Sequence, residues 1–149
     1  LKDSIIYVCE STGMLYGLPV GITPQIFASA VHVSGRATVA YEFYGGFGTG
    51  TRVTLKDPDS GSILSEYYLL LFGDVNGDGN IDSNDAGRIT DIGNWLYDWQ
   101  PELEAVLHRA ADLNADGNVD SIDADILTET ENWNMNIDQL TGLASVLVN

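Results

Sequence analysis

Hydrophobic and polar residues alternate in short runs through residues 1–72 of this 149-residue chain. The alternation is clearest in Ala37–Phe43 and Arg52–Lys56, as expected of strands that bury one face. β-Branched and aromatic residues fill these runs, and Gly, Pro and Asp separate them. The runs that predict strands are Ser4–Cys9, Val31–Val33, Ala37–Phe43, Arg52–Lys56 and Ile63–Phe72.

Two further signals complete this half of the chain. The segment Asp57–Gly61 predicts the turn of a hairpin, because its proline presets the backbone and its glycine accepts a positive φ. Thr23 followed by proline is typical of a helix start, so Thr23–Ala28 predicts a short helix. Residues 1–72 are therefore expected to form a small β-sandwich-like domain that carries one helix.

Residues 73–149 contain an internal repeat. The segment Gly73–Ala86 returns as Ala111–Ala124, and the likeness continues into the residues that follow each copy. Each copy thus predicts the same unit, a loop followed by a helix. Between the copies, Pro101–Ala110 has helical composition, and in the tail the apolar residues of Ile137–Val148 have near-helical spacing. We expect a helix in each of these two segments, and an overall α+β chain.

The two halves meet without a linker. Only Gly73 separates Phe72, which ends an apolar run, from Asp74, which begins the first loop. No stretch rich in Gly, Ser or Pro lies between them. We therefore expect two domains, residues 1–72 and 73–149, that pack as one semi-rigid body.

Each repeat places oxygen-bearing side chains at alternate positions of a twelve-residue loop, which is the spacing of a calcium loop. Position 6 is glycine, where the chain turns sharply, and position 12 is an Asp at the start of the helix, where its charge meets the positive helix end. The expected ligands are Asp74, Asn76, Asp78, Asn80, Asp82 and Asp85, then Asp112, Asn114, Asp116, Asn118, Asp120 and Asp123, where Asn80 and Asn118 at position 7 offer their backbone carbonyls. The carboxylates of each loop repel one another, so binding of two Ca²⁺ ions and folding of this half are expected to be coupled.

The repeats differ from complete EF-hands. Position 12 is Asp, where an EF-hand carries Glu, and Tyr67–Phe72 before the first loop resembles a strand. We expect half EF-hands without leading helices, in an all-α second half. The apolar eighth residues, Ile81 and Val119, are expected to pair the loops in a short β contact. Trp95 and Trp133 at equivalent helix ends are expected in the core.

The charge balance argues against several partners. The chain has 22 acidic and 6 basic residues and a formal charge of −16, which disfavours nucleic acid and anionic membranes. No apolar run is long enough to span a bilayer. Cys9 is the single cysteine, so no disulfide forms within the chain, and it is expected to be a small buried hydrophobe in a strand.

The tandem of loop–helix calcium repeats with Asp at position 12, preceded by a β-domain that ends in Phe72–Gly79, resembles the dockerins. Dockerins are modules of cellulosomal proteins that bind cohesin modules. The resemblance covers Gly73–Leu140. The preceding part is similar to the X modules of some dockerin proteins, through Phe47–Val53 and Asp57–Gly61. This resemblance implies a secreted, cellulosome-associated protein of polysaccharide degradation that docks onto a cohesin of a scaffoldin or a cell-surface anchoring protein.

The resemblance also implies where the partner binds. In dockerins, loop positions 10 and 11 and the exposed face of the adjoining helix contact cohesin. The matching residues here are Ser83, Asn84, Arg88, Thr90 and Asp91 in the first repeat and Ser121, Ile122, Ile126, Thr128 and Glu129 in the second. Two similar faces imply that cohesin docks in either of two orientations. Asn84 and Arg88 are replaced by isoleucines in the second repeat, which favours its face as the apolar anchor.

Other functions have less support in the sequence. His32 and His108 lie in different halves, and no nucleophile motif is present, so we expect no enzymatic activity. A calcium sensor or buffer would pair complete EF-hands, and a sensor would open a Met-rich groove, whereas the second half contains one methionine, Met135. The remaining alternative is a β-domain that binds carbohydrate on a stacking platform, with the calcium half as accessory. The platform would consist of Tyr41, Phe43, Tyr44 and Phe47.

Overall fold

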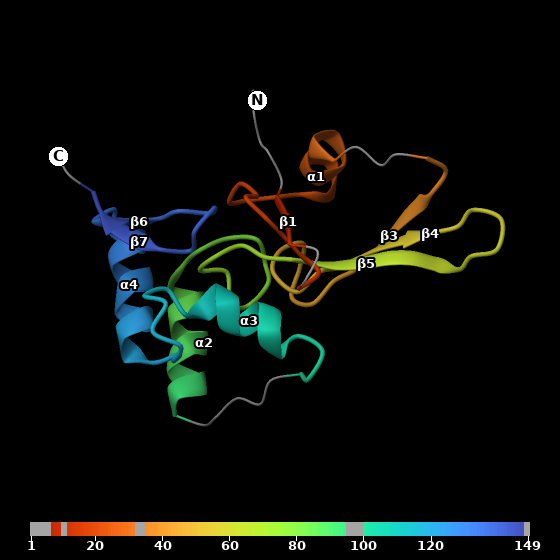
Figure 1. Cartoon of the computed structure of the whole chain (residues 1–149). Coiled ribbons are helices and arrows are strands. Elements are labelled where there is room, and N and C mark those ends of the chain that lie inside the picture. The colour runs from red at the N-terminus through yellow and green to blue at the C-terminus, as the bar shows by residue number, and fades with distance from the viewer. Residues whose placement is uncertain (1–6, 10–11, 32–34, 95–99, 148–149) are drawn as a thin grey trace.

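The computed structural model describes residues 7–9, 12–31, 35–94 and 100–147, and it mixes helices with strands (Figure 1). The N-terminal half contains a five-stranded sheet with the order β1-β2-β5-β4-β3. Neighbouring strands are antiparallel except β2, which runs parallel to β5. The strands are β1 (Tyr7–Cys9), β2 (Met14–Tyr16), β3 (Thr38–Glu42), β4 (Arg52–Lys56) and β5 (Ile63–Leu69).

Among the described residues of this half, one helix packs on this sheet. Helix α1 (Pro24–Ala30) buries Phe27, whose ring meets Tyr41 of β3 edge to face with the centroids 5.9 Å apart. The described residues of this half thus form one sheet with a helix, and the prediction of two facing sheets in a β-sandwich is wrong. The alternating pattern predicted the strands, but it does not determine how many sheets these strands form.

Most local predictions for this half are confirmed. Thr23 caps α1, because its Oγ1 accepts a hydrogen bond from Ile26 N at 3.2 Å. In the β4–β5 hairpin, Asp57 Oδ1 accepts hydrogen bonds from the turn residues Asp59 and Ser60. Strand β2 was not predicted. The strand expected at Val31–Val33 is not found at Val31, which ends α1. The other two residues of that expected strand, 32 and 33, lie outside the described part.

The end of β5 divides two hydrophobic cores. Leu69 and Leu71 point into a cluster formed by residues 15–71, whereas Leu70 and Phe72 point into a second cluster that includes the repeats. This alternation follows from the extended backbone, in which successive side chains face opposite sides. The two predicted halves therefore share one core across their boundary. The division at residue 72 itself stays a prediction.

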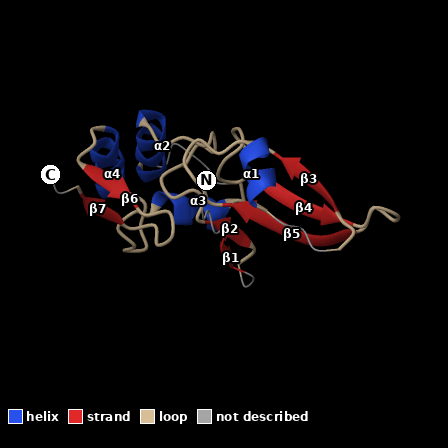
Figure 2. Ribbon diagram, turned by 90° about the horizontal axis from the view of Figure 1, so that it is seen from above, coloured by secondary structure: helices blue, strands red, loops and turns tan. Residues whose placement is uncertain are grey.

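The described residues of the second half form three helices, namely α2 (Ser83–Gly93) and α4 (Ser121–Glu131) of the repeats and α3 (Glu104–Ala111) between them. Helices α2 and α4 lie side by side, with α3 between them and the sheet (Figures 1 and 2). Helix α3 ends at the residue before Asp112, so it leads directly into the second loop. The prediction that both repeats lack a leading helix is wrong for the second, although it holds for the first, which follows β5.

The tail is a β-hairpin and not the helix that its apolar spacing predicts. Strands β6 (Met135–Ile137) and β7 (Ala144–Val146) pair antiparallel, so the second half is not all-α. The turn between them forms because Gly142 adopts φ +77° and donates its N–H to Asp138 O. The apolar spacing of the tail does not reveal this turn, which reverses the chain between the two strands. The Gln139 side chain anchors the tail, since it bonds Phe72 N and Phe72 O at 2.8 Å each.

The prediction that Trp133 lies in the core is also wrong. Its side chain is 83% exposed, and its backbone adopts φ +63° just after α4. This left-handed conformation ends the helix and turns the ring outward. Trp95 lies outside the described residues. Cys9 lies in β1 as expected, and the burial of its side chain lies outside the described residues too.

Candidate calcium centres

The first acid of the first loop organises the loop backbone. Asp74 is fully buried. Its Oδ1 accepts hydrogen bonds from Gly77 N (2.8 Å) and Asp78 N (3.1 Å). Its Oδ2 accepts from Gly79 N (3.0 Å) and from Thr49 N (2.9 Å), which belongs to the N-terminal half. One carboxylate thus fixes the loop and joins it to the N-terminal half.

The last acid of the loop closes it against the helix. Asp85 is also fully buried and occupies the third position of α2. Its Oδ1 accepts from Val75 N (2.8 Å) and Asn76 N (3.0 Å), and its Oδ2 accepts from Asp82 N (2.9 Å). Asp82 in turn caps α2, which completes a capping box. The Asp at position 12 therefore connects both ends of the loop to the helix start, as its predicted place at the positive helix end requires.

The second loop repeats this arrangement. Asp123 accepts from Leu113 N (2.8 Å) and Asp120 N (3.0 Å), and Asp120 caps α4 in a second capping box. Asp112 accepts from Asp116 N (3.2 Å) and Gly117 N (2.9 Å). The sequence repeat is thus also a structural repeat: the first acid of each loop accepts from the backbone of positions 5 and 6, and the last acid from that of positions 2 and 9.

The carboxylates of the first loop lie in an unfavourable place for negative charge. Burial, together with the neighbouring charges of Asp85 and Asp78, raises the pKa of Asp74 to about 7 against the lowering effect of hydrogen bonds from Thr49 and Gly79. Burial likewise raises the pKa of Asp85 to about 6. In the second loop, burial raises the pKa of Asp123. A bound cation would relieve this cost in both loops.

These pKa values predict how the calcium-free chain responds to pH. The folded chain holds the protons of Asp74 and Asp85 to a higher pH than the unfolded chain, whose Asp pKa is about 3.9. Calcium-free stability should therefore be greatest near pH 4 and fall as the pH rises through about 6 to 7. Thermal unfolding in calcium-free buffer between pH 4 and 8 measures this. Asp74→Asn should show a smaller pH dependence, and equal slopes for the two proteins would contradict the assignment to Asp74.

The donor chemistry of both loops fits calcium. Each loop offers carboxylate, side-chain amide and backbone carbonyl oxygens, which are the hard ligands that Ca²⁺ prefers. Among the residues that the structure describes, no three acidic, His or Cys side chains form a ready-made metal cluster. The fit therefore rests on the donor types and on the repeated loop conformation. The residues that would hold the ions are the twelve predicted from the spacing.

The predicted β contact between the loops is not formed. Ile81 and Val119 are half-buried and pack against the shared core, and neither belongs to a strand of the two described sheets. The contact of α2 with α4 relates the two repeats instead.

The predicted partner-binding residues lie on the surface of α2 and α4. Two of them, Arg88 and Ile126, are half-buried, and Ile126 packs against the shared core. Thr90 and Thr128 each donate their hydroxyl to the carbonyl four residues earlier, and Glu129 accepts from Asn134 Nδ2 at 2.7 Å. The exposed residues of the set are Ser83, Asn84, Thr90, Asp91, Ser121, Ile122, Thr128 and Glu129.

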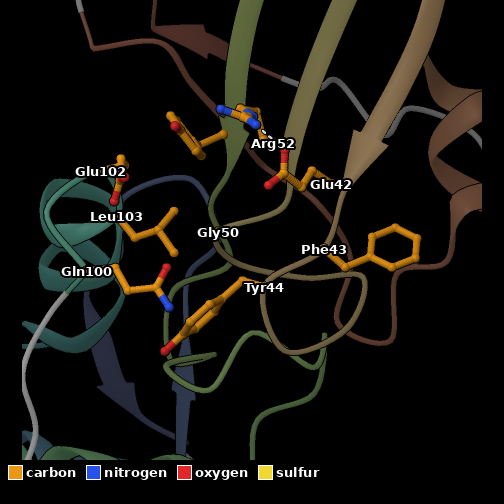
Figure 3. Close-up of a pocket in the computed structure, with 9 residues that line it drawn as sticks. Glu42, Phe43, Tyr44, Gly50, Arg52, Gln100, Glu102 and Leu103 are labelled. Carbon is orange, nitrogen blue, oxygen red and sulfur yellow. Dashed lines mark hydrogen bonds and ion pairs between the residues drawn. The ribbon is translucent and has the colours of Figure 1, made fainter.

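The predicted aromatic platform does not form one flat surface. Phe47 is buried in the N-terminal core, and the rings of Tyr41 and Phe43 meet it edge to face at 90°. A cavity of about 270 Å³ lies nearby between the sheet and the start of α3, lined in part by Tyr44 and Leu103 (Figure 3). Figure 3 shows the Phe43 ring turned away from Tyr44. Tyr41 and Phe43 thus pack against Phe47, and Phe43 and Tyr44 line the cavity, so the four rings do not present one stacking surface.

Sequence reasoning missed one component of the first site. Thr49 and the glycines around it, residues 45–50, lie against the first loop. The available signal was the presence of four glycines within these six residues. Such a run permits another backbone segment to approach closely, but it does not identify which segment of the chain that is.

The described residues thus contain two loop–helix units that offer calcium-type donors, and each unit has an exposed helix face. Residues 72–130 match the family model of the dockerin type I domain, and this part of the chain is a dockerin module. Dockerins bind calcium and dock onto cohesin modules. No curated protein and no solved structure gave a significant match to the chain. None of the described helices is long and apolar enough to cross a membrane.

Proposed function

We propose that this chain is a secreted, non-catalytic docking component of a cellulosome-type complex for polysaccharide degradation, and that two structural Ca²⁺ ions hold its docking surface. Its partner would be a cohesin of a scaffoldin or of a cell-surface anchoring protein. The observation that supports this most strongly is the repeated loop closed by Asp85 and Asp123, each of which fixes the start of a helix. The N-terminal domain, an X-module candidate, would stabilise the dockerin through the shared core.

The position of the loops suggests a structural role for the ions. Each loop ends in the capping box of α2 or α4, so an ion bound there fixes where that helix begins. A sensor instead couples calcium to the opening of a groove. Helix α3 gives the second loop an entering helix, as in an EF-hand, but β5 and Leu70–Phe72 precede the first loop. Because one loop follows a helix and the other follows a strand, this pair of loops supports a role in holding two helices in place more than a role in opening a pair of EF-hands.

The second repeat offers the better apolar anchor. Ile122 lies in the first turn of α4 with 53% of its surface exposed, whereas the equivalent Asn84 of α2 is polar. Ile126 is half-buried against the core, so it contributes less free surface than its sequence position suggested. An exposed isoleucine surrounded by the polar residues Ser121 and Asp125 is a suitable centre for an interface.

Matched substitutions at Ile122 and Asn84 test which face docks. Ile122→Asp should weaken binding to the best-binding cohesin of a panel by about 30-fold, the effect of losing about 2 kcal/mol at a hot spot. Asn84→Asp places the same residue at the same position of the first repeat and should change the Kd by less than about threefold. Both variants should keep the calcium-loaded far-UV circular dichroism spectrum. A larger loss for Asn84→Asp would assign docking to the first repeat.

A further inference from the structure

A glycine-rich segment of the N-terminal half lies directly on the first calcium loop. We call residues 45–50 the glycine segment. A methyl group added at Gly48 would overlap Asp74 Oδ2 and lie 2.8 Å from Gly79 Cα. A methyl group at Gly45 would overlap Asn76 O. The two backbones therefore approach so closely that only glycine fits at these positions.

Hydrogen bonds fasten the segment to the loop. Thr49 N donates to Asp74 Oδ2 at 2.9 Å, and Thr49 is itself fully buried. The Thr49 hydroxyl bonds both Leu71 N and Leu71 O at 3.0 Å. These bonds fix the glycine segment to the backbone just after the end of β5. A neighbouring turn adds a further bond from Gly21 N to Gly79 O at 2.7 Å. The first loop is thus held by groups outside the repeat.

The second loop has no such cover among the described residues. A methyl group at Gly117, the counterpart of Gly79, would have no heavy atom within 4 Å. Asp112 is half-buried and the residues 115–118 are exposed, whereas Asp74, Gly77 and Gly79 are buried. The Asp112 carboxylate accepts from its own loop. Loops of nearly the same sequence therefore occupy different environments.

We propose that the glycine segment is a positioning element that closes the first calcium site, so that the ion of the first loop leaves more slowly than the ion of the second. This inference rests on the proposed pair of calcium ions. The cover excludes water, and a lower local dielectric strengthens the attraction between the ion and its carboxylates. It also orders the loop before the ion arrives, which reduces the entropy cost of binding. Release from the first loop requires local opening of the segment, whereas the second loop opens freely to solvent.

Calcium release from the full chain tests this proposal. The calcium-loaded protein is mixed with an excess of fluorescent chelator in a stopped-flow instrument. We expect two phases of equal amplitude whose rates differ by at least about tenfold, since a cover that costs about 1.4 kcal/mol to open gives that factor. Asp112→Ala should remove the fast phase and keep the slow one. Gly48→Ala should accelerate the slow phase by about tenfold and leave the fast phase unchanged.

Gly87→Ala is the matched control, because a methyl group there meets nothing within 4 Å, and it should leave both phases unchanged. Amide exchange of the wild-type chain provides a test that needs no substitution. Gly79 N and Gly117 N each bond the first Asp of their loop, so slower exchange at Gly79 supports the cover. Two ions released at one rate, with equal exchange at both glycines, would overturn this inference alone. Failure of the wild-type chain to bind any calcium would overturn the proposed function instead.

Discussion

An excess of chelator is expected to unfold the repeats of the calcium-loaded chain and to abolish its binding to cohesin. Asp74, Asp85 and Asp123 are fully buried, and without a cation their charges oppose folding at neutral pH. A ligand present at about 1,000 times its Kd stabilises the folded state by about 4 kcal/mol per site. The free energy of unfolding lost on removal of two such ligands would exceed half the stability of an ordinary domain.

The loss should be confined largely to the repeats. The N-terminal core is formed by residues 15–71 alone, so β3, β4 and β5 should retain slow amide exchange after calcium is removed. The helical circular dichroism signal of α2, α3 and α4 should fall and return when calcium is restored. Magnesium at equal concentration should restore less of the helical signal than calcium, because Mg²⁺ requires shorter metal–oxygen bonds in octahedral geometry. An unchanged helical signal in excess chelator would contradict a structural role for calcium.

Asp85→Ala is expected to be the most damaging single substitution in the first repeat. It removes three hydrogen bonds from backbone N–H groups to a buried carboxylate, and hydrogen bonds to charged groups contribute about 1.5–3 kcal/mol each. It also removes half of the capping box of α2 and a calcium ligand. Together these losses should lower the free energy of unfolding in saturating calcium by on the order of 4 kcal/mol or more.

Chemical denaturation of the full chain in saturating calcium measures this effect. Asp125→Ala removes the same charge from an exposed position of α4 and should change the free energy of unfolding by less than about 0.5 kcal/mol. Calcium titration of Asp85→Ala should show loss of one site and retention of the other. If Asp85→Ala and Asp125→Ala had equal stabilities, position 12 would not close the loop.

The repeated features were predictable because local chemistry determines them. The Asp at position 12 lies where a capping box needs an acceptor, so Asp85 and Asp123 indicated both the end of the loop and the start of the helix. Thr23 before a proline and the Asp57 turn were likewise readable from short segments. In each case the side chain bonds a backbone within a few residues, and tertiary packing is not needed to specify the structure.

Several of the features that were missed depend on distant partners. The glycine segment reveals its role only through Asp74, which lies 25 positions from Thr49 in the chain. Gln139 anchors the tail hairpin to Phe72 across 67 positions, and this contact is not visible in the apolar spacing, which alone favoured a helix. Trp133 was assigned to the core by its size, but the backbone at the end of α4 turns it outward. Whether the strands form one sheet or two also depends on contacts that spacing does not encode.

The claim that calcium holds the docking surface is tested most directly by isothermal titration calorimetry. The full chain is titrated into members of a cohesin panel, once in excess calcium and once in excess chelator. The proposed function predicts strong binding to at least one cohesin in calcium and no measurable heat of binding in chelator. High-affinity binding that persists in excess chelator would contradict it.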